Sequence, residues 1–282
     1  MPELPEVESV RSGLEKLIQG KTIKTVNVYW DRIIAEPSNV EAFKRQLVDQ
    51  KIEAIGRRGK FLLFQLTDYV LISHLRMEGK YRIEESTVPL TKHTHVVFSL
   101  DDGVELRYLD VRKFGRMSLV EKDLVHTHKS LAKLGPEPFD GTLRLTELDR
   151  QLKKRKKMIK ASLLDQTVIA GIGNIYADEI LFEARIYPGR LSNSLSDLEM
   201  TNLHKAILLV MGKAVKAGGT TIRTYMNAFG ETGTYQASLN VYGKDGQPCV
   251  RCGTIIEKTK IAQRGTHYCP NCQLENGPIE PV

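Results

Sequence analysis

The apolar residues near the start of the chain recur at intervals of three or four positions. They are Val7, Val10, Leu14, Leu17 and Ile18. This spacing places them on one face of a helix, so it predicts an amphipathic helix over residues 5–19 that ends at Gly20. A second short helix is predicted from Ser38 to about residue 49, because Ser38-Asn39-Val40-Glu41 has the spacing of a capping box.

The rest of residues 21–120 is rich in short segments that are typical of β-strands. The predicted strands are Thr22–Tyr29, Phe61–Leu66, Tyr69–His74, His95–Leu100 and Val104–Leu109. Asp101-Asp102-Gly103 predicts a hairpin turn between the last two strands. Several short strands with this spacing predict a β-sandwich or a flattened barrel.

A change in composition predicts a domain boundary near the middle of the chain. Residues 134–141 contain two prolines and two glycines, which is typical of a linker. We therefore expect an N-terminal domain over residues 1–134, a linker over 135–141, a second domain over 142–240 and a C-terminal segment over 241–282. The second domain is predicted to be helical near 145–154, 157–165, 174–185 and 197–216, followed by a long loop over 218–240.

The charge balance favours an acidic partner. The chain has 41 Lys and Arg against 34 Asp and Glu, a net charge of +7. Basic residues cluster at Arg57-Arg58-Gly59-Lys60, at residues 153–157 and near the C-terminus, which suits a polyphosphate, although a run such as 153–157 is equally typical of a solvated helix face. No apolar stretch reaches the roughly 18 residues of a membrane span, and the acidic N-terminus lacks a signal-peptide core, so we expect a cytoplasmic protein.

Four cysteines with regular spacing predict a metal site. Cys249 and Cys252 form one CxxC pair, and Cys269 and Cys272 form a second pair after 16 residues. This arrangement is typical of four thiolates around one structural Zn²⁺, with no open position for water. Two disulfides or a redox site are the alternatives. The residues between the pairs predict a hairpin of Thr254–Thr259 and 266–268 with Arg264 at its tip, where a guanidinium can bind phosphate.

The second and third residues are candidate catalytic groups. Removal of Met1 would leave Pro2 with a secondary amine, which can attack an electrophilic carbon and form an iminium. Glu3 lies beside this amine and can act as general acid or base. The alternative is that proline and glutamate only favour the start of a helix.

A glycine-rich turn between two predicted helices is a candidate phosphate site. Gly171 and Gly173 precede Asn174, which begins the next helix, so backbone amides and the positive end of the helix dipole could bind an anion there. A plain helix–turn–helix connection explains the same residues.

Four segments in this order resemble bacterial formamidopyrimidine-DNA glycosylases: Met1–Glu8, Arg58–Leu63, Gly171–Glu179 and the four-cysteine segment. The resemblance covers essentially the whole chain. It implies an α+β protein with an N-terminal β-sandwich and catalytic N-terminal helix, then a helical domain with a helix-two-turn-helix element and a four-cysteine zinc finger. It also implies a monomeric DNA-repair enzyme that binds damaged double-stranded DNA in the cleft between its domains.

The resemblance assigns a reaction and catalytic residues. The family extrudes an oxidised purine such as 8-oxoguanine or a formamidopyrimidine, removes it, and cleaves the strand as an AP lyase by β,δ-elimination. Pro2 would attack C1′ to give a Schiff base, and Glu3 would transfer protons. Lys60 would contact phosphate and assist proton transfer, and Arg264 would assist the later elimination. Glu6 would orient the N-terminus, or would serve only as a helix-start residue.

Further residues match DNA contacts of the family. Asn174 would bind phosphate, and Met77, Arg112 and Phe114 would fill the space left by the extruded nucleotide, although an apolar Met77 or Phe114 is also typical of a core. The remaining matches are DNA contacts at His93 and Arg155 and lesion-loop residues Arg223 and Tyr225.

Two rival classes remain open. The related endonuclease VIII type acts on oxidised pyrimidines, but commonly has glycine where this chain has Leu4. A zinc-ribbon DNA-binding protein without enzymatic activity explains the charge and the cysteines, but gives Pro2, Glu3 and Lys60 no purpose.

Overall fold

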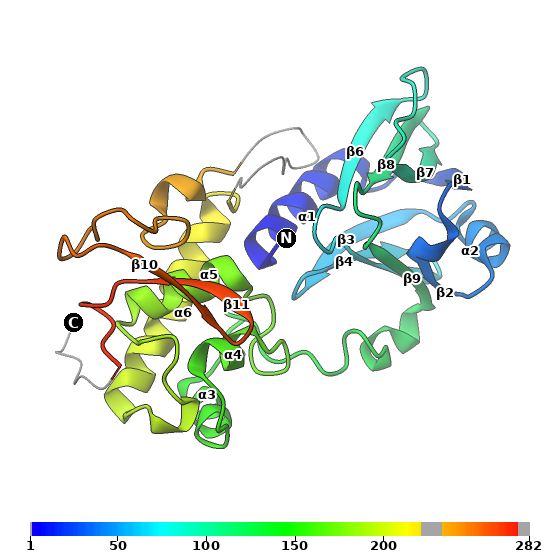
Figure 1. Ribbon diagram of the computed structural model, residues 1–282. Coiled ribbons are helices and arrows are strands. Elements are labelled where there is room, and N and C mark those ends of the chain that lie inside the picture. Colours follow the sequence, from blue (N-terminus) through cyan, green and yellow to red (C-terminus); the bar gives the residue numbers. More distant parts are fainter. Residues whose placement is uncertain (1, 221–232, 276–282) are drawn as a thin grey trace. The chain divides into compact units, whose positions relative to one another are not determined.

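The computed structural model describes residues 2–220 and 233–275 (Figure 1). The chain forms two compact units. The first comprises Met1–Ala132 and Gly218–Thr234, and the second comprises Lys133–Ala217 and Tyr235–Val282. The first unit is mainly β and the second mainly helical, which confirms the predicted α+β class.

The first unit has two sheets that share one hydrophobic core (Figure 1). The first sheet has the order β1 (Ile23–Val28), β7 (Thr94–Leu100), β8 (Val104–Leu109) and β6 (Lys80–Glu85). The second has the order β2 (Ile34–Glu36), β9 (Arg116–Glu121), β5 (Tyr69–His74), β4 (Phe61–Leu66) and β3 (Ile52–Arg58). Neighbouring strands are antiparallel except for β2 and β9, and in β4 Leu62, Phe64 and Leu66 alternate into the core.

Four strands, β2, β3, β6 and β9, are not predicted from the sequence pattern. β6 reads Lys-Tyr-Arg-Ile-Glu-Glu and lies at a sheet edge, so only Tyr81 is buried and the apolar alternation is weak. β2 is only three residues long and also lies at an edge. Short or polar edge strands form because a neighbouring strand pairs with them, and this pairing leaves little trace in their own sequence.

Helices cover the sandwich at the predicted places. α1 (Leu4–Ile18) buries Val7, Val10, Leu14 and Ile18. α2 (Val40–Leu47) follows Asn39, whose side-chain oxygen accepts a hydrogen bond from the Ala42 amide at 2.9 Å. Asn39 therefore caps this helix, and the predicted start at Ser38 was wrong by one residue. Two 3₁₀ helices, η1 (Asp31–Ile33) and η2 (Lys122–Thr127), complete the unit.

The second unit contains α3 (Leu145–Lys153), α4 (Ile159–Leu164), α5 (Asn174–Glu183) and α6 (Asp197–Lys216), with η3 (Ser192–Ser194) and η4 (Tyr235–Ser238). The capping box before α6 is present, since Ser196 N donates to Glu199 Oε2 at 2.8 Å and Glu199 N donates to Ser196 Oγ at 3.2 Å. α5 is almost entirely buried and packs against α6 and the finger hairpin β10 (Glu257–Ile261) and β11 (Arg264–Tyr268). Among the described residues, none of the helices is both long and apolar enough to cross a bilayer.

Candidate active site and nucleic-acid contacts

The start of α1 places a buried carboxylate at the centre of a small hydrogen-bond network. Pro2 and Glu3 are buried, and Glu3 N donates to Glu6 Oε2 at 2.8 Å. Glu6 Oε1 accepts hydrogen bonds from Thr220 N at 2.7 Å and Thr220 Oγ1 at 3.0 Å. Glu6 therefore caps the helix and also holds Thr220, which belongs to the first unit although the sequence pattern joined it to the second domain.

Lys60 lies in the turn between β3 and β4. Gly59 adopts a φ of 56°, and Lys60 is 6% exposed. The turn is tied to α1 by Arg57, which donates to Glu8 Oε2 at 2.8 Å and to the Gly59 carbonyl at 2.9 Å. The position of Lys60 thus depends on the same helix that begins beside Pro2 and Glu3.

His74 is a candidate site residue that the sequence analysis missed. His74 lies in β5 and pairs with Phe61 of β4, the residue that follows Lys60 in the sequence. Burial, with the nearby positive charges of Arg76 and Lys60, lowers the pKa of His74 to about 3, so its ring is neutral at pH 7. Its Nδ1 accepts a hydrogen bond from Arg76 N at 2.9 Å. Nε2 therefore carries the hydrogen and can donate it.

Met77 and Phe114 are exposed, at 38% and 47%, so the alternative that they belong to the core was wrong. The Arg112 guanidinium carbon lies 4.7 Å from the centre of the Phe114 ring, which is a cation–π contact. His93 is half-buried, and its amide donates to Thr91 Oγ1 at 3.3 Å. Met77, Phe114 and the Arg112 guanidinium therefore provide apolar and cationic groups outside the core of the first unit.

A buried ion pair organises the second unit. Lys160 Nζ lies 2.6 Å from Asp178 Oδ1, and both side chains are fully buried. Lys160 Nζ also donates to the Gly265 carbonyl at 3.0 Å and to Thr266 Oγ1 at 2.8 Å. Asn174 Nδ2 donates to the same Gly265 carbonyl at 3.0 Å. The glycine-rich turn and the finger hairpin are therefore joined beside Arg264.

Arg264 is exposed at the start of β11. The residues at the tip are Ala262 and Gln263, which have φ values of 50° and 60° and form a two-residue hairpin turn. The predicted tip and strand bounds of the hairpin were therefore shifted along the sequence, because the type of turn sets the register.

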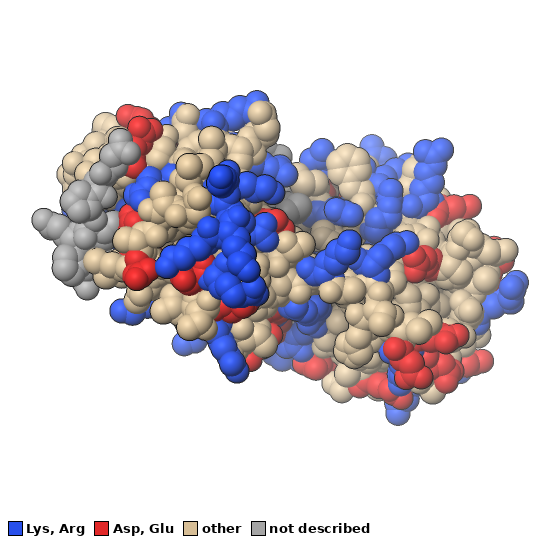
Figure 2. All heavy atoms as spheres, turned by 90° about the horizontal axis from the view of Figure 1, so that it is seen from below, with Lys and Arg blue, Asp and Glu red and all other residues tan. Residues whose placement is uncertain are grey.

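The basic run at residues 153–157 contains side chains that form ion pairs and side chains that are exposed to solvent. Lys153 pairs with Asp149 and Asp197, and Arg155 lies 3.4 Å from Asp165. Lys154, Lys156 and Lys157 are exposed. Figure 2 shows Lys and Arg side chains gathered on the side of the second unit where Figure 1 has α3 and the hairpin tip. This face is suited to a polyanion.

The four cysteines fit a tetrahedral metal site. Their sulfur atoms all lie within 4.8 Å of one another, with separations of 3.9 Å for Cys249–Cys272 and 3.5 Å for both Cys252–Cys269 and Cys252–Cys272. Zn–S bonds of about 2.3 Å imply S···S distances of about 3.8 Å, whereas a disulfide requires about 2.05 Å. The amides of Arg251 and Cys272 each donate to a cysteine sulfur at 3.4 Å. The four sulfur atoms thus fit one structural zinc ion, as predicted, and such an ion would stabilise the finger that carries Arg264.

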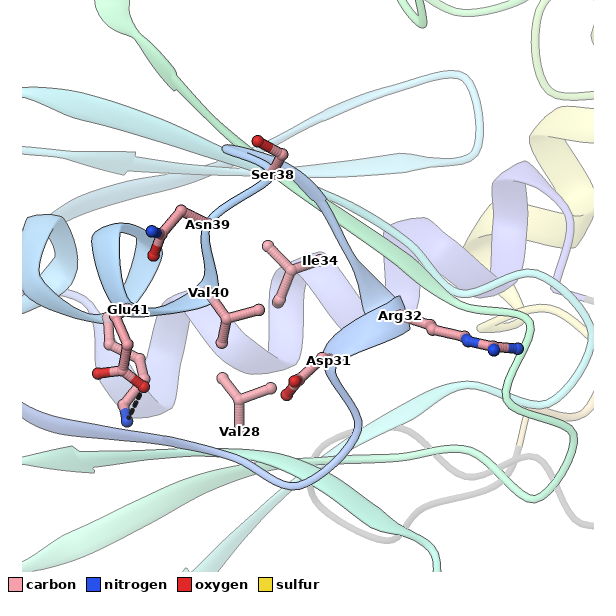
Figure 3. Close-up of a pocket in the computed structure, with 9 residues that line it drawn as sticks. Val28, Asp31, Arg32, Ile34, Ser38, Asn39, Val40 and Glu41 are labelled. Atoms are coloured by element: carbon pink, nitrogen blue, oxygen red, sulfur yellow. Dashed lines mark hydrogen bonds and ion pairs between the residues drawn. The ribbon is translucent and has the colours of Figure 1, made fainter.

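A hollow between η1 and α2 contains none of the predicted site residues (Figure 3). Its lining includes Asp31, Arg32, Asn39 and Glu41, and Glu41 pairs with Lys44 at 2.9 Å. Two other predicted residues, Arg223 and Tyr225, lie outside the described part of the chain.

The β-sandwich that begins with Pro2-Glu3 and the helical unit with the four-cysteine finger both match known protein families. Three families match in order: the formamidopyrimidine-DNA glycosylase N-terminal domain over residues 1–117, the H2TH domain of the same enzymes over 134–226, and the zinc finger found in FPG and IleRS over 246–274. The chain belongs to the formamidopyrimidine-DNA glycosylase family, which confirms the resemblance seen in the sequence.

Individual members of the family are similar in sequence along nearly the whole chain. The formamidopyrimidine-DNA glycosylase of Enterococcus faecalis is 57% identical over 277 residues, which cover 98% of this chain and 99% of the relative. That of Bacillus cereus is 52% identical over 273 residues, covering 97% and 99%. The structure of Lactococcus lactis Fpg in complex with DNA containing an abasic site matches with a TM-score of 0.92 and 44% identity over 96% of this chain and 99% of that one.

Proposed function

We propose that this chain removes oxidised purines from double-stranded DNA and then cleaves the strand at the abasic site. The observation that carries this proposal is the buried Pro2-Glu3 pair at the start of α1, in a chain that matches the family along its whole length. Solved relatives include a mutant of Lactococcus lactis Fpg with DNA containing Fapy-dG and MutM with DNA containing carbocyclic 8-oxo-G. We place the enzyme in the bacterial cytoplasm and expect it to act as a monomer.

The reaction begins with the Pro2 amine after removal of Met1, because an acylated nitrogen is not a nucleophile. The amine attacks C1′ of the damaged nucleoside, and the bond from C1′ to the base breaks as the base takes up a proton. Loss of the amine proton and opening of the sugar ring give an iminium, the Schiff base. Glu3, adjacent to the amine, moves the protons of these steps.

Strand cleavage follows from the electron-withdrawing iminium. Removal of a proton from C2′ expels the 3′ phosphate by β-elimination, and a second elimination expels the 5′ phosphate. Hydrolysis of the Schiff base then releases the sugar remnant and regenerates Pro2. The products are a one-nucleotide gap with phosphate at both ends. Arg264, exposed on the finger, supports the later elimination by neutralising phosphate charge.

Both units supply donors for the DNA backbone. In the first unit, Lys60 offers an ammonium group and His74 a neutral Nε2–H donor. In the second unit, Lys160, which pairs with Asp178, and Asn174 both donate to the Gly265 carbonyl and so support the hairpin that carries Arg264. Arg264 and Asn174 are the proposed phosphate contacts of this unit. Such contacts fix the register of the protein on DNA without reading sequence. Arg155 and His93 add further contacts.

The exposed residues of the first unit fill the gap in the duplex. An extruded nucleotide leaves unpaired stacking surface and an orphaned partner base. Met77 and Phe114 replace the stacking, while Arg112 donates to the acceptor edge of the orphaned base. An orphaned cytosine offers O2 and N3 to this arginine, so 8-oxoguanine opposite cytosine is the expected substrate.

Borohydride reduction of the protein with a duplex containing 8-oxoguanine tests the proposal. We expect a covalent protein–DNA adduct whose peptide begins at Pro2 in mass spectrometry. A variant in which Met1 is retained should form no adduct. An adduct that maps only to Lys60, or undiminished trapping in the variant with Met1, would refute the role of Pro2. Faster single-turnover cleavage of a duplex with an oxidised thymine would instead assign the chain to the endonuclease VIII type.

A further inference from the structure

Two loops of the first unit meet at one buried hydroxyl group. Residues 75–79 carry Met77, and residues 110–115 carry Arg112 and Phe114. A Cβ atom added at Gly79 would lie 2.1 Å from the Tyr108 hydroxyl oxygen, and one added at Gly115 would lie 1.8 Å from it. Tyr108 is fully buried, so no side chain fits at either glycine unless the tyrosine moves. The two loops are therefore packed against the same rigid group.

The side chain of Asp110 fixes the second loop from within. Its Oδ1 accepts a hydrogen bond from Arg112 N at 3.0 Å, and its Oδ2 accepts from Phe114 N and Gly115 N, both at 2.8 Å. Asp110 is 1% exposed. A carboxylate offers only acceptors, so it can satisfy three converging amide donors that a neutral amide side chain cannot satisfy together.

The backbone of Asp110 ties the same loop to the segment that contains His93. Asp110 N donates to the His93 carbonyl at 3.0 Å, and the Asp110 carbonyl accepts a hydrogen bond from His95 Nε2 at 2.7 Å. Asp110 thus connects the backbone of His93 to the backbone of Arg112 and Phe114. Lys113, between these last two residues, adopts a φ of 57° and lies 4.1 Å from the centre of the Trp30 ring. A residue in the left-handed region needs such support.

We propose that Asp110 is a positioning residue that holds Arg112 and Phe114 ready to enter the duplex. This inference rests on the proposed function, in which these two residues fill the space left by the extruded nucleotide. A loop that is ordered before binding avoids the entropy cost of being ordered by DNA. Loss of the carboxylate leaves three amides to seek other partners and releases the loop, while Pro2 and Glu3 are unchanged.

The test compares two substrates for Asp110→Asn. A duplex with 8-oxoguanine opposite cytosine needs the gap to be filled, whereas a single-stranded abasic oligonucleotide has no partner strand. Single-turnover cleavage of the duplex should fall roughly ten- to hundredfold, the range expected for loss of one hydrogen bond to a charged group. Borohydride trapping on the single strand should stay within about twofold of the parent protein. Asp102→Asn, in the exposed turn between β7 and β8, is the matched control and should change neither rate.

A double-mutant cycle with Arg112→Ala adds a readout that a purely structural role would not move. If Asp110 acts through the loop, Asp110→Asn should reduce the rate of duplex cleavage much less in the Arg112→Ala background than in the parent protein. Equal losses on both substrates, or full additivity in the cycle, would overturn the inference. If Asp110→Asn fails to fold, Asp110→Glu, which keeps the charge but shifts the carboxylate, should show the same selective loss on the duplex. A parent protein that cannot be trapped on either substrate would refute the proposed function instead.

Discussion

The buried pair of Lys160 and Asp178 makes the sharpest prediction about stability. In Asp178→Asn the Lys160 ammonium loses its counter-charge, although both positions have no exposure to solvent. The amide of His267, which donates to Asp178 Oδ2 at 3.0 Å, must also compete for the one remaining acceptor oxygen. Removing one partner of a buried ion pair costs about 3–5 kcal/mol. We therefore expect the second unit to unfold at a temperature lower by roughly 10 °C or more.

Two signals separate the two units in this assay. Trp30 is the single tryptophan of the chain and lies in the first unit, so its fluorescence follows that unit. Release of zinc to a coloured chelator follows the finger in the second unit. Asp178→Asn should lower the temperature of zinc release and leave the Trp30 transition in place. Adding Lys160→Met should recover part of the loss, because the unpaired buried charge is gone.

The control is Asp197→Asn, which breaks a pair with Lys153 at a side chain that is 92% exposed. This surface pair should leave the temperature of zinc release unchanged. A loss below about 1 kcal/mol in Asp178→Asn would contradict the reasoning, since the buried pair would then behave like a surface pair. An equal shift of the Trp30 transition would also contradict it.

Three further outcomes follow from the structure. Cys252→Ser should lose zinc in metal analysis and weaken DNA binding at constant salt, while the Trp30 transition stays in place; retention of zinc would contradict the four-thiolate site. Gly115→Ala should lower the melting temperature because its methyl group would meet the Tyr108 hydroxyl at 1.8 Å, whereas Gly212→Ala, in open space inside α6, should stabilise by about 0.5–1 kcal/mol. The pKa of His74 is about 3 in the folded protein, whereas that of an ordinary histidine is 6.5, so between these pH values the folded protein binds fewer protons than the unfolded chain. The stability that this group contributes is complete above pH 6.5 and is lost as the pH falls toward 3. His74→Gln should therefore reduce the slope of the free energy of unfolding against pH, measured by urea denaturation, by about 1.4 kcal/mol per pH unit within this window.

The amino-acid sequence by itself determined the features that depend on near neighbours in the chain. The helix over residues 197–216 followed from apolar spacing and from the capping box at Ser196, and both act within a few residues. The zinc site followed from the two CxxC pairs, because four thiolates with this spacing leave few alternatives. Pro2 and Glu3 were found because the covalent chain makes them adjacent.

Only the tertiary structure decided the features that join distant segments. Glu6 and Thr220 are 214 residues apart, Lys160 and Gly265 are 105 apart, and no local pattern specifies either contact. The low pKa of His74 likewise depends on burial within the folded sandwich. Met77 and Phe114 could not be distinguished from core residues by type alone, since exposure depends on which loops the sheets leave uncovered. Local propensity is encoded over a few residues, whereas burial, register and charge pairing arise only when remote segments pack together.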